Sequence, residues 1–132
     1  MKKSILVIDD DVTVRALIKA RMGAARDGNE GYQVLLAENG ARGLELAAEQ
    51  RPGLILLDWM MPGMGGLEVL SRLKTTPATA DIPVVMLTAK KLMGDIERAL
   101  EQGAEWYLTK PVDLDKLIRR VKQSWSANPL AA

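Results

Sequence analysis

Six side chains from four separate segments of this sequence are of types that could do chemistry together: Asp9, Asp10, Asp11, Asp58, Thr88 and Lys110. Carboxylates brought close together repel one another, by roughly 3 kcal/mol for two charges about 5 Å apart at an effective dielectric near 20. Such a cluster therefore keeps protons or binds a cation, and oxygen ligands without imidazole or thiolate favour Mg²⁺, with Mn²⁺ as an alternative. A carboxylate nucleophile, a divalent cation, a lysine and a threonine are the parts of a phosphoryl-transfer site, because that reaction mainly needs positioning and charge neutralisation.

The composition excludes several other kinds of chemistry. The chain has 132 residues with no Cys and no His, which rules out disulfides, thiolate or imidazole nucleophiles and zinc sites built on those residues. Its 18 basic and 17 acidic residues are scattered and give a formal charge of +1, unlike the basic stripe of a nucleic-acid reader. The apolar stretch near the start is too short for a signal peptide or a membrane-spanning helix. We therefore expect a cytoplasmic protein without a nucleic-acid or membrane partner.

Short apolar runs rich in Val, Ile and Leu recur five times along the chain: Ile5–Ile8, Val34–Leu36, Leu54–Leu57, Val84–Leu87 and Trp106–Leu108. They are too short for helices and show no polar alternation, which is typical of strands covered on both faces. Stretches with helical spacing lie between them, so the pattern predicts a single α/β domain with a five-stranded parallel sheet. Ligands of such sheets bind at the carboxyl ends of the strands, where the acidic residues, the threonine and the lysine all lie.

Local patterns add detail to this prediction. Two of the expected helical faces are formed by Val14, Leu17, Ile18 and Met22 and, more weakly, by Ala41, Leu44 and Ala48. The segment Gly23–Gly31 is the longest polar connection, and we expect a mobile loop there. Residues 126–132 continue no apolar pattern and are expected to fray.

The ordered motifs Asp9-Asp10, Asp58, Thr88-Ala89 and Lys110-Pro111, with the segment Leu57–Met64, resemble a response-regulator receiver domain (CheY-like) of two-component signalling. The resemblance extends from about Lys3 to about Trp125. It implies a doubly wound, flavodoxin-like (βα)5 fold with strand order 2-1-3-4-5. Residues 1–125 would form the receiver domain and residues 126–132 a tail. With no output domain in this sequence, we expect either a stand-alone receiver or a piece of a longer regulator.

The resemblance also implies a role for each residue of the site. Asp58 would be the phosphoacceptor, and Lys110, followed by a cis bond to Pro111, would contact Asp58 and then the phosphoryl group. Mg²⁺ would be held directly by Asp10, Asp58 and the backbone carbonyl of Met60, and through a water by Asp9. Because the chain has no His, a sensor histidine kinase or histidine phosphotransfer protein would be the donor. The protein would not be an enzyme in the usual sense, since it catalyses only transfer to, and hydrolysis from, its own Asp58.

The expected readout is a change of shape near the phosphorylated residue. In receivers the hydroxyl matching Thr88 moves toward the phosphoryl group and the aromatic ring matching Tyr107 changes rotamer, although adjacent Trp106 could take that role. This would remodel the face of the fourth helix, fifth strand and fifth helix, which would bind a downstream protein or output domain or form a phosphorylation-dependent dimer. Gly65 stands where many relatives carry Asp, which weakens the expected cap of the third helix.

Two alternatives remain from the sequence. Asp9-Asp10-Asp11-Val12-Thr13 fits the opening motif of haloacid-dehalogenase-type phosphatases, with Asp9 as nucleophile and Asp11 as general acid. Against this, Asp58 precedes both Thr88 and Lys110, whereas those enzymes place their last acidic motif after the lysine. The other alternative is a docking module that works without phosphorylation.

Overall fold

The computed structural model describes residues 3–27, 30–89 and 93–127. Strands and helices alternate along this part of the chain: β1 (Lys3–Ile8), α1 (Val12–Ala24), β2 (Arg26–Asp27), β3 (Glu30–Ala37), α2 (Gly40–Gln50), β4 (Leu54–Asp58), α3 (Gly66–Thr75), β5 (Val84–Thr88), α4 (Met93–Glu101), β6 (Trp106–Thr109) and α5 (Leu114–Ala127). Helix α5 thus extends two residues beyond the expected boundary at residue 125, and residues 128–132 of the expected tail lie outside the described part. None of the described helices is long and apolar enough to cross a bilayer.

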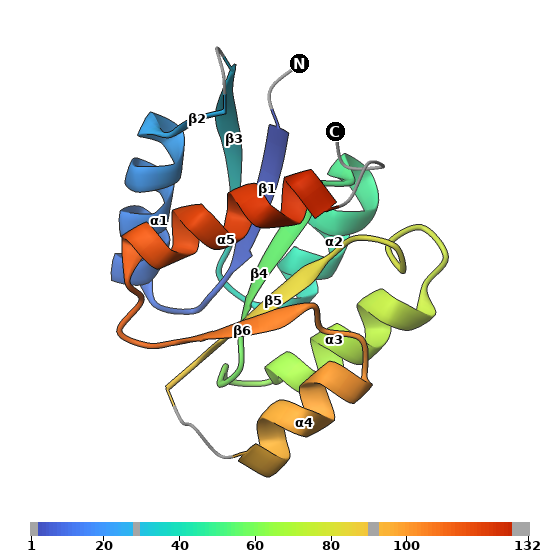
Figure 1. The fold of residues 1–132 in the computed structure, drawn as a ribbon. Helices are drawn as coiled ribbons and strands as arrows, with labels where there is room; N and C mark the ends of the chain where they lie inside the picture. The colour runs from blue at the N-terminus through green and yellow to red at the C-terminus, as the bar shows by residue number, and fades with distance from the viewer. Residues whose placement is uncertain (1–2, 28–29, 90–92, 128–132) are drawn as a thin grey trace.

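The five predicted strands form one parallel sheet, seen in the middle of Figure 1. The sheet order is β2-β3-β1-β4-β5-β6, and every pair except β2 with β3 is parallel. Without β2 this is the expected order 2-1-3-4-5. Central β1 pairs with β3 on one side and β4 on the other, so that Ile5 lies between Val34 and Leu54. The fold class is confirmed.

The segment expected to be a loop after α1 contains regular structure instead. Helix α1 continues to Ala24. Strand β2 then pairs antiparallel with the start of β3, with Arg26 opposite Gly31. The physical reason is that β3 is longer than its apolar run, and its first residues offer free backbone groups that a short neighbouring strand can satisfy. Residues 28 and 29 of this segment lie outside the described part.

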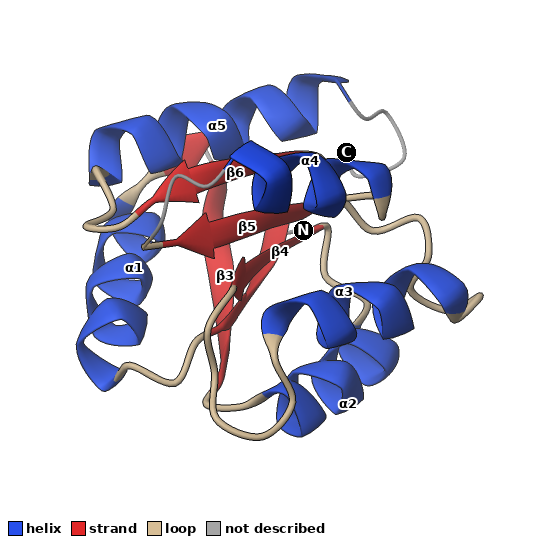
Figure 2. Ribbon diagram, turned by 90° about the horizontal axis from the view of Figure 1, so that it is seen from below, coloured by secondary structure: helices blue, strands red, loops and turns tan. Residues whose placement is uncertain are grey.

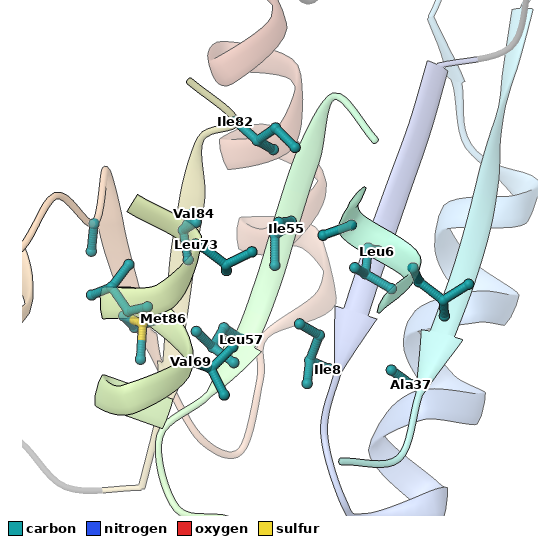
Figure 3. Packing of buried hydrophobic residues seen from close by; sticks show 14 of the residues in the cluster. Leu6, Ile8, Ala37, Ile55, Leu57, Val69, Leu73, Ile82, Val84 and Met86 are labelled. Carbon is teal, nitrogen blue, oxygen red and sulfur yellow. The ribbon is translucent and has the colours of Figure 1, made fainter. Parts of the chain in front are cut away.

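Helices cover both faces of the sheet (Figure 2). An apolar layer lies on each face, because successive strand residues point to opposite sides. Helices α1 and α5 cover one face through buried residues that include Ile18, Met22, Leu117 and Val121. Helices α2, α3 and α4 cover the other, and Figure 3 shows Ile55 and Leu57 of β4 beside Leu73 and Val69 of α3. Both layers leave the carboxyl ends of the strands uncovered.

Helix α2 faces the sheet with a different side from the one predicted. Ala41 and Ala48 are exposed, whereas Gly40 and Gly43 lie on the buried side. A Cβ atom at position 43 would press into the side chain of Ile8, so this glycine permits the helix to lie directly against β1. The predicted stripe was wrong because it counted apolar side chains, while the packing depends on the absence of a side chain.

Candidate functional site

The parallel sheet brings the predicted site residues to one edge. Asp9 follows the last residue of β1, Asp58 ends β4, Thr88 ends β5 and Lys110 follows β6. Asp9, Asp58 and Thr88 are buried. The backbone N–H of Lys110 donates a 2.7 Å hydrogen bond to the Thr88 carbonyl, which fixes where the lysine side chain leaves the sheet. The peptide between Lys110 and Pro111 is cis, as expected.

Lys110 bridges the two buried carboxylates. Its Nζ lies 2.9 Å from Oδ2 of Asp9 and 3.1 Å from Oδ1 of Asp58. The lysine side chain is 20% exposed, so these contacts are shielded from bulk water and count for more than a surface ion pair. The predicted contact between Lys110 and Asp58 is confirmed, and the amine also holds Asp9.

Three carboxylates at this edge could hold a cation. One ligand oxygen from each of Asp9, Asp10 and Asp58 lies within 4.8 Å of the others. Asp9 and Asp58 are buried and Asp10 is exposed, so the cluster opens to solvent on the Asp10 side. A hard divalent cation that keeps several waters fits such an all-oxygen, half-open set.

Burial has the largest effect on the pKa of Asp58. Together with the nearby Asp9 carboxylate, and against the opposing pull of Lys110, it raises the pKa of Asp58 from 3.8 to about 7. Burial on its own would lower the pKa of Lys110, but its contacts with Asp9 and Asp58 outweigh this and raise that pKa above its usual value. Without a cation, Asp58 therefore ionises near neutral pH beside a permanently charged lysine.

Asp11 makes structural contacts at the start of helix α1. Its carboxylate caps α1 by accepting hydrogen bonds from the backbone N–H groups of Thr13 (2.8 Å) and Val14 (3.4 Å). Its own backbone N–H donates to Oδ1 of Asp9 at 2.9 Å. The third aspartate thus starts the helix and orients its neighbour, an arrangement that gives no support to a general-acid role.

Sequence reasoning missed one residue of the site, Arg15. Its Nη1 donates a 2.7 Å hydrogen bond to the backbone carbonyl of Asp9. The residue is half-buried and lies one turn into α1. In the sequence, Arg15 is marked only by its position on the helix that follows the aspartates. That position does not reveal that its side chain reaches back past the helix start to the Asp9 carbonyl.

Comparisons with known proteins agree with this geometry. The family model of the response regulator receiver domain matches residues 5–122. This chain belongs to the response regulator receiver domain family. The receiver domain fold recurs in the solved structure of the Francisella response regulator 1452 receiver domain, which is 29% identical, has a TM-score of 0.83, and is matched over 96% of this chain and 98% of that one.

Two longer response regulators show the same relationship in sequence. The phosphate regulon transcriptional regulatory protein PhoB of Pseudomonas aeruginosa is 41% identical over 120 residues, which are 91% of this chain and 50% of that protein. The response regulator PleD of Caulobacter vibrioides is 43% identical over 122 residues, 92% of this chain and 26% of that protein. This chain therefore spans half or less of the length of these relatives. Receiver domains are phosphorylation-activated signalling switches rather than conventional enzymes; they receive phosphoryl groups from kinases and act on downstream partners.

The two aromatic residues of the receiver's last strand have different environments. Tyr107 is half-buried and packs against the apolar layer beneath α2, α3 and α4. Trp106 is 44% exposed, and its ring stacks on that of Tyr107 with centroids 5.3 Å apart. The guanidinium of Arg120 lies 5.4 Å from the Trp106 ring centroid and pairs with Glu105 at 2.9 Å. Only a movement of Tyr107 would change core packing directly.

The loop after β4 is shaped by glycine. The backbone N–H of Gly66 donates to the Trp59 carbonyl at 2.9 Å, and a Cβ atom at position 66 would collide with the Asp58 carbonyl. This glycine therefore brings the start of α3 directly against the strand end that carries Asp58. Gly65 is the N-cap of α3 and makes no side-chain cap hydrogen bond, as expected. Met60 is 65% exposed at the same edge.

An apolar groove of about 450 Å³ lies between α1 and α5 and reaches the receiver's acidic edge; its lining residues are Asp11, Val14, Leu17, Ile18, Lys110, Pro111, Val112 and Leu114. Leu17, predicted to be part of the core-facing stripe, is 52% exposed here. The prediction was wrong for this residue: Leu17 lies in the wall of the groove, whereas Ile18 and Met22 of the same stripe are buried in the layer against the sheet. An apolar surface thus adjoins Lys110.

Proposed function

We propose that this receiver accepts a phosphoryl group on Asp58 from the phosphohistidine of a sensor histidine kinase or a histidine phosphotransfer protein. The observation that carries the proposal is the buried Asp58 carboxylate with Lys110 Nζ 3.1 Å from its Oδ1 and two further carboxylates beside it. An oxygen of Asp58 attacks phosphorus, the phosphorus–nitrogen bond breaks, and its electron pair stays on the donor imidazole. The 132 residues of this sequence contain no His, so the donor histidine lies outside them.

The acidic cluster supports a cation site for Mg²⁺ or Mn²⁺. Asp10 and Asp58 would bind it directly together with the backbone carbonyl of Met60, and Asp9 would bind through a water. When bound, the cation offsets the repulsion among the carboxylates and neutralises charge on the phosphoryl oxygens. Lys110 neutralises further charge, since its raised pKa keeps it protonated. Hydrolysis by water then releases phosphate and restores the Asp58 carboxylate.

The readout proceeds through Thr88 and Tyr107. Phosphorylation adds about −1.5 to −2 charge units and strong acceptor oxygens at the strand ends. The Thr88 hydroxyl moves toward these oxygens, and the Tyr107 ring moves into the space that it leaves. Edge strand β6 lies between α4 and α5 (Figures 1 and 2), so the change reaches a continuous α4–β6–α5 face. That face binds a downstream protein, an output domain or a second phosphorylated copy.

The groove between α1 and α5 supports a protein as the donor. A small phosphodonor needs only the acidic edge, whereas a protein donor would also cover the apolar surface beside it. Leu17 is 52% and Val12 67% exposed on that side, and Met60 is 65% exposed on the other. Apolar side chains around a charged centre are typical of a surface that a partner covers.

The test is phosphorylation by acetyl phosphate with and without Mg²⁺, followed by mass spectrometric mapping of the modified residue. We expect one phosphoryl group on Asp58, lost with EDTA and in Asp58→Asn, and retained in the matched exposed-site control Asp81→Asn. A label on Asp9 with Asp58 unmodified would instead indicate the phosphatase alternative. A folded protein that takes no label from acetyl phosphate or from a histidine kinase would be a docking module.

A further inference from the structure

We infer that Arg15 is a positioning residue of the cation site: through the Asp9 carbonyl it holds the backbone from which the Asp10 carboxylate projects. Because this deepens the proposed function, it depends on Asp10 being a cation ligand. It adds a residue that touches neither the cation nor the phosphoryl group.

The Asp9 carbonyl is the backbone group that needs such a partner. Asp9 lies beyond Ile8, the last residue of β1 in register with β3 and β4. The Asp9 N–H still donates to the Ala37 carbonyl at 3.1 Å, but the Asp9 carbonyl lies past the ladder. The Nη1 of Arg15 donates to it at 2.7 Å, a short, charge-assisted bond.

This hydrogen bond fixes more than one atom. The carbonyl of Asp9 and the N–H and Cα of Asp10 lie in one rigid peptide plane. Holding the oxygen therefore fixes the direction in which Asp10 leaves the strand. The Asp9 side chain is fixed independently by Asp11 N–H and Lys110. Asp10 is exposed and its side chain shares a hydrogen bond with the Asp58 carboxyl, so its backbone sets the direction from which it reaches that carboxyl.

Arg15 also carries a charge, and charge and position act on cation affinity in opposite directions. A guanidinium near the cluster repels a divalent cation, so loss of its charge alone would tighten Mg²⁺ binding. Loss of the hydrogen bond would let the Asp9–Asp10 peptide rotate and weaken binding. Groups that orient metal ligands typically change metal affinity 10–100-fold when removed. The sign of the change therefore separates the two roles.

The experiment compares Arg15→Met, Arg15→Lys and a matched control, Arg21→Met, in the full chain. Arg21 lies on the same helix, and its guanidinium pairs at 2.6 Å with Asp115, away from the acidic cluster. Met and Arg have similar helix propensity, so both methionine variants retain α1. Mg²⁺ affinity is measured by calorimetry, and the Asp10 amide is followed by ¹H–¹⁵N NMR in the metal-free protein.

We expect Mg²⁺ to bind about tenfold more weakly to Arg15→Met, with Arg15→Lys between it and the wild type because lysine keeps a donor. The Asp10 amide should shift in Arg15→Met and stay in place in Arg21→Met, which should also bind Mg²⁺ like the wild type. Unchanged or tighter binding by Arg15→Met, or an unmoved Asp10 amide, would overturn the positioning role while leaving the proposed function intact. A wild-type protein that binds no Mg²⁺ would remove the proposed cation site and this role together.

Discussion

Replacing Asp58 with Asn should stabilise the metal-free protein at pH 8. The pKa of Asp58 is raised from 3.8 to about 7 chiefly by burial, with Asp9 adding to the effect. A difference of about 3 pH units corresponds to about 4 kcal/mol spent on keeping this carboxylate ionised in the folded state. The amide cannot reproduce the contact with Lys110, so we expect a net gain of about 1–3 kcal/mol in the free energy of unfolding.

The pH dependence follows from the direction of the shift. Below pH 3.8 the Asp58 carboxyl is protonated in both the folded and the unfolded state. Between pH 3.8 and about 7 the unfolded chain releases this proton while the folded chain keeps it, so wild-type stability falls as the pH rises. The advantage of Asp58→Asn should therefore be largest above pH 7 and shrink by up to about 1.4 kcal/mol for each pH unit below it.

Urea unfolding in EDTA, followed by tryptophan fluorescence at several values between pH 5 and pH 8, measures the effect. The exposed carboxylate of Asp81 provides the control, since Asp81→Asn should leave this pH dependence in place. Mg²⁺ at ten times its Kd should add about 1.4 kcal/mol to the wild type and much less to Asp58→Asn. A variant less stable than the wild type at pH 8, or a gain that does not change with pH, would refute the assigned electrostatics.

Four further substitutions test the packing and the donor surface. Gly65→Ser should raise the free energy of unfolding by about 0.5–1 kcal/mol in urea melts, because it adds the missing cap where a Cβ meets no atom; a loss of stability would contradict this. Gly43→Val should lose about 2–3 kcal/mol by pressing into Ile8, whereas Gly23→Ala, whose Cβ has open space, should gain about 0.5–1 kcal/mol in the same assay. Leu17→Glu should slow phosphorylation by a cognate kinase at least tenfold and leave phosphorylation by acetyl phosphate unchanged; equal slowing of both would remove the groove from donor recognition.

Local sequence patterns determined the strands and the location of the site. The run Leu54–Leu57 has no polar alternation because both faces of β4 are covered. Asp9, Asp58 and Thr88 directly follow such a run, and Lys110 follows one after a single intervening residue. They could be assigned to one edge because parallel strands share their carboxyl ends. These are properties of residues near one another in the chain, together with one general rule of sheet geometry.

Tertiary structure decided which atoms from distant parts of the chain touch, and therefore the electrostatics of the site. The raised pKa of Asp58, the contact of Lys110 with Asp9 as well as Asp58, and the hydrogen bond from Arg15 to the Asp9 carbonyl all depend on distances between separate elements. The close approach of Gly43 to Ile8 and the exposed position of Leu17 depend likewise on how helices pack. Apolar periodicity records which residues avoid water; it does not record which neighbour a helix meets or how closely it approaches, and those distances set the electrostatics at the strand ends.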